Sequence, residues 1–277
     1  MTEMPPQPAV RIRPQSGWSA LDLAALWDYR ELAYYMVWRD IKVRYKQTVL
    51  GVGWALVQPL ASMVVFTVVF GRLAGLPSEG VPYAVFTMAA LLPWQLFVNA
   101  FNGAANSVTS NAGVITKVYF PRLVVPLSAV AATLVDFAVS LLLLAALMIW
   151  YGVSLGPNLI FLPLFTFVAL LTALAAGLWS AALNVKYRDV RYVLPYLLQL
   201  WLLVSPVAYS TTLIPERWQT IYALNPLVAV IQGFRWALFG GQSPWDLIAG
   251  SLAVTLVLLV GGLYFFRRAE AMFSDLI

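Results

Sequence analysis

The sequence contains no cysteine and no histidine among its 277 residues. These absences exclude disulfide bonds, thiol chemistry, imidazole acid–base catalysis and haem-type ligation. Charge is also scarce, because Asp, Glu, Lys and Arg make up 10% of the chain, against roughly 25% in a soluble domain. With 61% hydrophobic residues, the chain has more apolar surface than one water-soluble core can bury. The composition predicts an all-α polytopic membrane protein.

Several enzyme signatures are missing as well. No Gly-x-x-x-x-Gly-Lys-Ser/Thr loop is present, so the chain lacks a P-loop for ATP. No Gly-x-Ser-x-Gly motif or metal-ligand spacing occurs, so we expect no catalytic site, no metal site and no cofactor in this chain. Asp136 is the one acid deep in an apolar stretch. It is either a structural residue hydrogen-bonded near Thr133 or Ser140, or a gating residue.

Six apolar stretches approach or exceed the roughly 17–25 residues that a helix needs to cross a bilayer. We expect these transmembrane helices at 49–70, 82–101, 122–150, 158–183, 193–209 and 246–266. With both termini in the cytoplasm, all but three of the 17 Lys and Arg residues fall on the cytoplasmic side, which is the favoured arrangement. The three on the outside are Arg72, Arg217 and Arg235.

The two ends of the chain are expected to lie outside the transmembrane domain, 49–268. Residues 1–18 are polar and Pro-rich and lack the apolar core of a signal peptide, which predicts a flexible cytoplasmic tail. Residues 269–277 are expected to form a second cytoplasmic tail. Ser19 followed by Asp22 predicts the start of a cytoplasmic interface helix over 19–48.

The interface helix is expected to be amphipathic. Aromatic and aliphatic residues recur at helical spacing and predict an apolar underside: Tyr34, Val37, Trp38, Ile41 and Tyr45. Basic residues flank this face: Arg39, Lys42, Arg44 and Lys46. Asp40 is expected to pair with Arg44 one turn further on.

Two connecting segments are ambiguous. The apolar stretch 227–241 is short and interrupted by Arg235, so we expect one or two short re-entrant helices in the outer leaflet over 213–240, with Asn225-Pro226 at the turn. The loop 102–121 and the basic segment 184–191 face the cytoplasm. Both are either ordinary loops with basic anchors or a docking surface for another protein.

Spans one, two and five each carry a face of amides, hydroxyls and aromatic rings, whereas spans three and six are mostly aliphatic. The simpler interpretation is hydrogen bonding between helices. The functional interpretation is a lumen for an uncharged polyhydroxylated ligand, because sugar C–H faces can lie on rings while hydroxyls bond to amides. The candidate channel residues are Trp54, Gln58, Trp94, Phe97, Asn99, Phe101, Tyr196 and Gln199. Pro59 lets the first span bend around the path.

Five segments together resemble a known family. They read WRDIKVRYKQTVLGVGWALVQPL, KVYFPRLVVPLS, NVKYRDVRYVLPYLLQLWLLVSPVAYS, IPERW and YALNPLVAVIQGFRW. Their order and spacing resemble the permease subunits of type-2 ABC exporters for polysaccharides, a Wzm-like family that includes O-antigen and teichoic acid permeases. The resemblance extends from about residue 30 to 268.

The resemblance implies a homodimer in the bacterial inner membrane, above two copies of an ATP-binding cassette ATPase that bind ATP and Mg. The implied cargo is a lipid-linked polysaccharide, typically on undecaprenyl pyrophosphate. A coupling helix is implied within 102–121, where the candidate ATPase contacts are Val114, Ile115, Lys117, Val118 and Tyr119. The basic cluster of the interface helix then lies near the pyrophosphate, or is only a juxtamembrane anchor that attracts anionic lipids.

Other functions remain open at this point. The same architecture could move teichoic acid, capsule, a drug or a lipid. An intramembrane transferase would need a cluster of acids, histidines or a metal site, and a secondary transporter would need a titratable relay or an internal repeat. No nucleic-acid partner is expected.

Overall fold

The computed structural model describes residues 23–46, 53–187 and 189–276. The predicted tail at 1–18 and the predicted helix start at Ser19 and Asp22 lie outside these residues. Within them, the regular structure is helical and contains no β-strand. The helices in chain order are α1 Leu23–Asp28, α2 Arg30–Tyr45, α3 Gly53–Phe66, η2 Thr67–Leu73, α4 Tyr83–Ser110, α5 Ala112–Ile115, α6 Val124–Trp150, η3 Leu159–Phe161, α7 Leu162–Lys186, α8 Val190–Val204, η4 Thr211–Leu213, α9 Glu216–Tyr222, α10 Pro226–Phe239 and α11 Trp245–Leu276.

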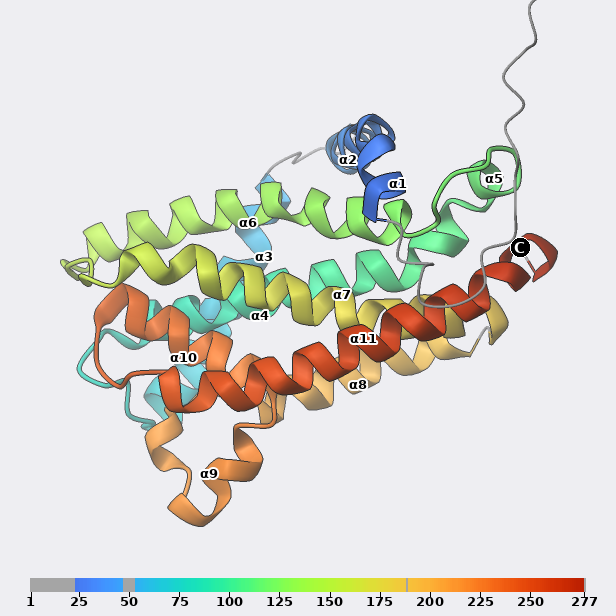
Figure 1. Ribbon diagram of the computed structural model, residues 1–277. Helices are drawn as coiled ribbons and strands as arrows, with labels where there is room; N and C mark the ends of the chain where they lie inside the picture. The colour runs from blue at the N-terminus through green and yellow to red at the C-terminus, as the bar shows by residue number, and fades with distance from the viewer. Residues whose placement is uncertain (1–22, 47–52, 188, 277) are drawn as a thin grey trace, which may run out of the picture.

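Five stretches of the described chain are long and apolar enough to cross a membrane. Each coincides with a predicted span: Gly53–Leu73, Tyr83–Ser110, Val124–Trp150, Leu159–Lys186 and Trp245–Glu270. Helices α4, α6, α7, α8 and α11 run along a common direction (Figure 1). The prediction of an all-helical, multi-pass membrane protein is therefore confirmed.

The remaining predicted span, 193–209, differs from the structure in length. Helix α8 has 15 residues and ends at Val204, so it is about 22 Å long against an apolar bilayer core of about 30 Å. Pro206 disfavours helical geometry at Ser205, whose backbone is extended with ψ 147°. The helix therefore stops earlier than hydrophobicity alone predicts.

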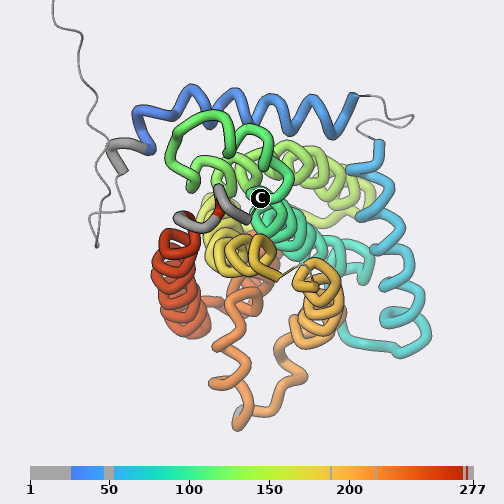
Figure 2. The backbone as a smooth tube through the Cα atoms, turned by 90° about the vertical axis from the view of Figure 1, so that its right-hand side faces the viewer, coloured from blue at the N-terminus to red at the C-terminus, as the bar shows by residue number. Residues whose placement is uncertain are grey.

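Helix α4 is the central element of the bundle. Figure 2 looks along the bundle and shows α4 surrounded by the other long helices. Small residues let α7 approach α4 closely. A Cβ added at Gly177 of α7 would lie only 2.5 Å from the Cβ of Ala104 in α4. Helix α4 also continues to Ser110, so the first part of the predicted loop 102–121 is helix.

Helix α3 lies at the edge of the bundle (Figure 2). In the stretch Gly53–Leu73, which α3 forms together with η2, only 11% of the most apolar part is buried within the chain. It contains Pro59 and is followed by a π-helical segment at Thr67–Leu73. An apolar helix that leaves most of its surface uncovered must meet either lipid or another protein.

Helix α2 crosses the bundle, because it is seen end-on in Figure 1 and lengthwise in Figure 2. It packs on α6. The predicted aromatic underside is only partly correct: Met36 is the buried side chain, while Tyr34 and Trp38 are exposed. The face toward the bundle is thus set by the contact with α6 and not by the ring stripe.

The short helices fall where they were predicted. Helices α9 and α10 are separated by a turn at Asn225-Pro226, and the Asn225 side chain caps α10 by accepting a hydrogen bond of 3.1 Å from the Leu227 backbone. At the C-terminus, α11 continues to Leu276. The predicted cytoplasmic tail at 269–277 is helical as far as Leu276, as a continuation of α11.

Candidate functional site

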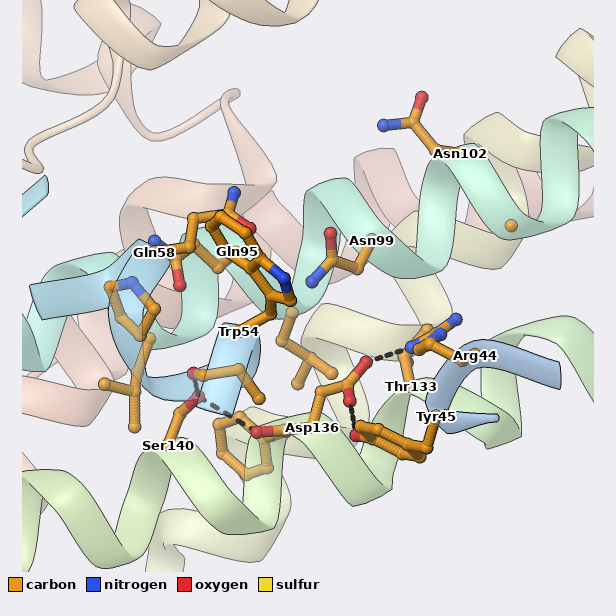
Figure 3. A pocket seen from close by; sticks show the side chains of 16 residues that line it. Arg44, Tyr45, Trp54, Gln58, Gln95, Asn99, Asn102, Thr133, Asp136 and Ser140 are labelled. Atoms are coloured by element: carbon orange, nitrogen blue, oxygen red, sulfur yellow. Dashed lines mark hydrogen bonds and ion pairs between the residues drawn. The ribbon is translucent and has the colours of Figure 1, made fainter. Parts of the chain in front are cut away.

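A cavity of about 390 Å³ lies between the C-terminal end of α2 and helices α3, α4 and α6. Figure 3 shows side chains from all four helices around it. Its lining consists of Arg44, Tyr45, Trp54, Ala55, Gln58, Pro59, Leu92, Gln95, Leu96, Asn99, Asn102, Gly103, Thr133, Asp136, Phe137 and Ser140. It is therefore the place where the predicted polar face of span one meets that of span two.

Asp136 of α6 is at the centre of the polar network on one side of this cavity. Its carboxylate accepts hydrogen bonds from the Arg44 guanidinium and the Tyr45 hydroxyl, as the dashed lines in Figure 3 show. The Arg44 side chain is 40% exposed and that of Asp136 is 15% exposed. The acid in the third span is thus paired with a cation from outside the spans.

Thr133 and Ser140, the residues predicted near this acid, line the same cavity but do not bond to its carboxylate. Ser140 does not reach the Asp136 carboxylate; its hydroxyl lies 2.9 Å from the Asp136 backbone carbonyl and 3.2 Å from that of Ala55. Thr133 bonds to the Val130 carbonyl at 2.7 Å. The predicted pair between Asp40 and Arg44 is wrong. Asp40 instead pairs with Arg39 at 2.7 Å, because Arg44 turns toward Asp136.

The same carboxylate affects the pKa of the Tyr45 hydroxyl. Burial, together with the hydrogen bond to Asp136, raises the pKa of Tyr45 from 10.0 to about 12. Tyr45 therefore stays protonated at neutral pH and remains a donor to Asp136. The result is a cation, a phenol and a carboxylate that join α2 to α6.

The other side of the cavity is lined by amides. Gln58 comes from α3, and Gln95, Asn99 and Asn102 come from α4. Figure 3 shows Gln58, Gln95 and Asn99 on the side opposite Asp136, with the Trp54 indole between them. Since Arg44 and Asp136 neutralise each other, the lining carries amides, hydroxyls and a ring but no net fixed charge.

The predicted channel residues divide into three groups. Trp54, Gln58 and Asn99 line the cavity together. Trp94, Phe97 and Phe101 are buried in the core, where Phe97 is 0% exposed and its ring centre lies 5.0 Å from that of Trp201. Tyr196 and Gln199 lie on the exposed side of α8 and outside the cavity. In this conformation Phe97 is not at a surface that a second subunit could share.

The predicted basic cluster does not act as one unit. Arg39 pairs with Asp40, Lys42 lies with its ammonium 5.4 Å from the centre of the Trp38 ring, and Arg44 binds Asp136. Lys46 is exposed at the end of α2. Of these four, Arg44 alone lines the cavity.

The predicted coupling residues form a small turn at one end of the bundle. Val114, Lys117, Val118 and Tyr119 are exposed, whereas Ile115 is 1% exposed and belongs to a buried cluster with Phe120 and Phe266. The Arg122 guanidinium donates a hydrogen bond to the Ile115 carbonyl. Ile115 and Arg122 therefore anchor the turn, and its other side chains face outward.

A second polar cluster, at the opposite end of the bundle, was not predicted as a site. The Arg235 side chain is 1% exposed, donates to the carbonyls of Tyr209 and Val207 at 3.0 and 3.1 Å, and lies 3.6 Å from the centre of the Phe86 ring. The sequence signal was the interruption of an apolar stretch by one arginine. In the structure that arginine fixes the segment between α8 and α9 through its hydrogen bonds to the backbone carbonyls of that segment.

These features define a class: a multi-pass helical membrane protein with a polar cavity of no net fixed charge among its helices. Within the described ranges, no three His, Cys, Asp or Glu side chains gather as possible metal ligands. The chain belongs to the ABC-2 type transporter family, whose model matches residues 31–239. The resemblance drawn from the sequence motifs is thus confirmed.

Individual relatives match over nearly the whole chain. An O-antigen export system permease protein RfbA of Myxococcus xanthus is 29% identical over 253 residues, covering 90% of this chain and 96% of that protein. A protein of the same name from Klebsiella pneumoniae is 26% identical, covering 86% and 92%. The polysialic acid transport protein KpsM of Escherichia coli is 28% identical, covering 86% and 93%.

Proposed function

We propose that this chain is the permease subunit of an ATP-driven ABC exporter that moves a lipid-linked polysaccharide across the bacterial inner membrane. The observation that carries this proposal is the near full-length similarity to permeases named for O-antigen export. The amide-lined cavity fits the same cargo chemistry, because uncharged amides and an indole suit sugar hydroxyls and C–H faces.

In the proposed exporter two copies of this chain form the path. Helix α3 supports this arrangement, since it leaves most of its apolar surface uncovered while its Trp54 and Gln58 line the cavity. A second subunit against this edge would enclose the amides of α3 and α4. The exposed Tyr196 and Gln199 of α8 then belong to the same path, and Arg44 lies at its entrance.

The proposed topology has six crossings and cytoplasmic termini. Helix α8 serves as the fifth crossing together with the extended segment that follows Val204, and α9 with α10 forms a re-entrant pair on the outer side. The distribution of Lys and Arg supports this orientation. Helix α2, which lies across the bundle, is then the cytoplasmic interface helix.

ATP hydrolysis is assigned to two cassette ATPase subunits that bind ATP and Mg, since this chain has no P-loop. The outward-facing Val114, Val118 and Tyr119 supply an apolar surface for docking, on a turn anchored by Ile115. The conformational change that ATP hydrolysis drives in the ATPase is then transmitted from this turn to α4 and α6, the two helices that flank it in the chain.

Deletion of this chain in its own bacterium tests the proposal. We expect loss of long-chain polysaccharide from the cell surface, with lipid-linked glycan accumulating inside, and restoration by the wild-type chain. Purified chain alone should hydrolyse no ATP, and turnover should appear with the cassette partner. Normal surface polysaccharide in the deletion strain, or ATP turnover by the isolated chain, would refute the proposal.

A further inference from the structure

A second hollow, which shares no lining residue with the amide cavity, lies at the end of the bundle that carries α5. It is a groove of about 400 Å³ between the C-terminal parts of α7 and α11. Its walls are apolar, with Ala182, Val185, Phe265, Ala269 and Phe273, and two cations complete the lining, Lys186 and Arg268. Both cations are exposed.

The level of the groove in the membrane follows from where the apolar parts of the two helices end. Helix α7 ends at Lys186, and the long apolar run of α11 is interrupted by Arg267 and Arg268. The groove therefore lies where the hydrocarbon of the bilayer gives way to headgroups. Phosphate groups of lipids lie at this level, and cations near the ends of spanning helices reach toward them.

The apolar walls are held in place by neighbouring contacts. Phe265 stacks on Trp179 with ring centres 4.9 Å apart, and the Trp179 indole donates to the Leu258 carbonyl at 2.9 Å. Phe273 packs on Phe266 with ring centres 5.2 Å apart. These contacts position the apolar walls, and in a membrane an acyl chain is an apolar group available to cover them.

The charges of this region are unevenly paired. Arg267 makes a salt bridge of 3.1 Å with Glu270, and the Arg122 backbone donates to the same carboxylate at 3.2 Å. Lys186 and Arg268 make no salt bridge with any acid in the part of the chain that the structure describes. The Lys186 ammonium instead lies 5.1 Å from the centre of the Tyr187 ring.

We propose that this groove binds an anionic phospholipid of the bilayer, with its phosphate on Lys186 and Arg268 and an acyl chain against Phe265 and Phe273. Basic pockets between spanning helices are suited to anionic lipid headgroups. Free phosphate would use the two cations and leave the apolar walls uncovered. The bound lipid would link the ends of α7 and α11 and stabilise that end of the bundle.

Native mass spectrometry of the purified full-length chain tests this proposal. The probes are phosphatidylglycerol and phosphatidylcholine with identical acyl chains, added in equal amounts. The wild type should retain phosphatidylglycerol preferentially. Lys186→Gln and Arg268→Gln should each lower that preference about fivefold, because one cation near an anionic lipid strengthens its binding by about this factor.

Arg217→Gln is the matched control, since Arg217 is an exposed cation on α9 and outside the groove. It should leave the preference unchanged. The double variant Lys186→Gln, Arg268→Gln should also lose the gain in melting temperature that phosphatidylglycerol gives the wild type. An unchanged preference in the double variant, or an equal loss in Arg217→Gln, would overturn the proposal. A lipid bound in the groove should also displace inorganic phosphate from the two cations. Inorganic phosphate that binds equally well with and without lipid would therefore overturn the proposal as well.

Discussion

The guanidinium of Arg44, at the end of α2, binds the carboxylate of Asp136 in α6, although the two residues are 92 positions apart in the chain. Tyr45 donates to the second oxygen of the same carboxylate. This contact fastens the crossing helix to the bundle at the edge of the amide cavity. It also neutralises the acid of the third span, which explains how an aspartate can lie there.

Removing the acid should destabilise the fold. Asp136→Asn leaves the Arg44 cation partly buried without a counter-charge, so we expect the free energy of unfolding to fall by about 1–3 kcal/mol. Arg44→Gln should have a similar effect for the converse reason. Melting temperatures of the purified variants measure both changes. The double variant should lose less than the two single losses added together, and additive losses would show that the two residues do not interact.

The Tyr45 phenol should give the protein a pH-dependent loss of stability at alkaline pH. Folding raises its pKa from 10.0 to about 12, so its contribution is complete below pH 10 and is lost as the pH rises through the folded value. Between pH 10 and 12 the melting temperature of the wild type should therefore fall relative to Tyr45→Phe. Parallel curves for the two proteins across this range would contradict the pKa shift.

Cysteine labelling can separate the cavity from the core, because the chain has no native cysteine. Gln58→Cys and Gln199→Cys should react with a water-soluble thiol reagent in the resting complex, since both side chains are exposed in the single chain and the proposed path between two chains keeps them in contact with water. Phe97→Cys should not react, because Phe97 is 0% exposed.

The same variants report on the path during transport. If Phe97 joins the path, Phe97→Cys should become reactive only while ATP is hydrolysed. Leu258→Cys, on α11 and away from the cavity, is the control whose labelling should not depend on ATP. Resting labelling at 97, with none at 58, would show that the face of α4 that carries Phe97 lines the path in place of the amide face.

The exposed turn around α5 offers a pair of variants with opposite outcomes. Val118→Glu places a charge on a side chain that is 53% exposed, so it should leave the melting temperature unchanged while it uncouples ATP hydrolysis from export. Ile115→Ala truncates a buried anchor and should lower stability by about 2–5 kcal/mol. Wild-type export by Val118→Glu would argue against docking at this turn.

Arg235 should not be replaceable by lysine. Its planar guanidinium reaches two backbone carbonyls and stacks on Phe86, and one ammonium cannot reproduce that geometry. We expect Arg235→Lys to lower the free energy of unfolding by about 1–3 kcal/mol. Arg217→Lys, at an exposed position on α9, is the control and should melt like the wild type.

Much of the architecture was predictable from local sequence. Five apolar stretches are long enough to cross a membrane, and their length and composition alone define them. The turn at Asn225-Pro226 was also predictable, because Asn can cap a helix and Pro fits its first turn. Pro206 carried the local signal that α8 would end early, although the run of apolar residues obscured it.

Only the tertiary structure decided which polar residues share a site. Asn99 and Phe97 are two residues apart on α4, yet one lines the cavity and the other is buried against Trp201. Asp40 is four residues from Arg44, but Arg44 turns instead to Asp136 on another helix. Sequence spacing records which residues share a helix face, whereas the neighbour of that face depends on how the helices pack. The cavity and its salt bridge are consequences of that packing.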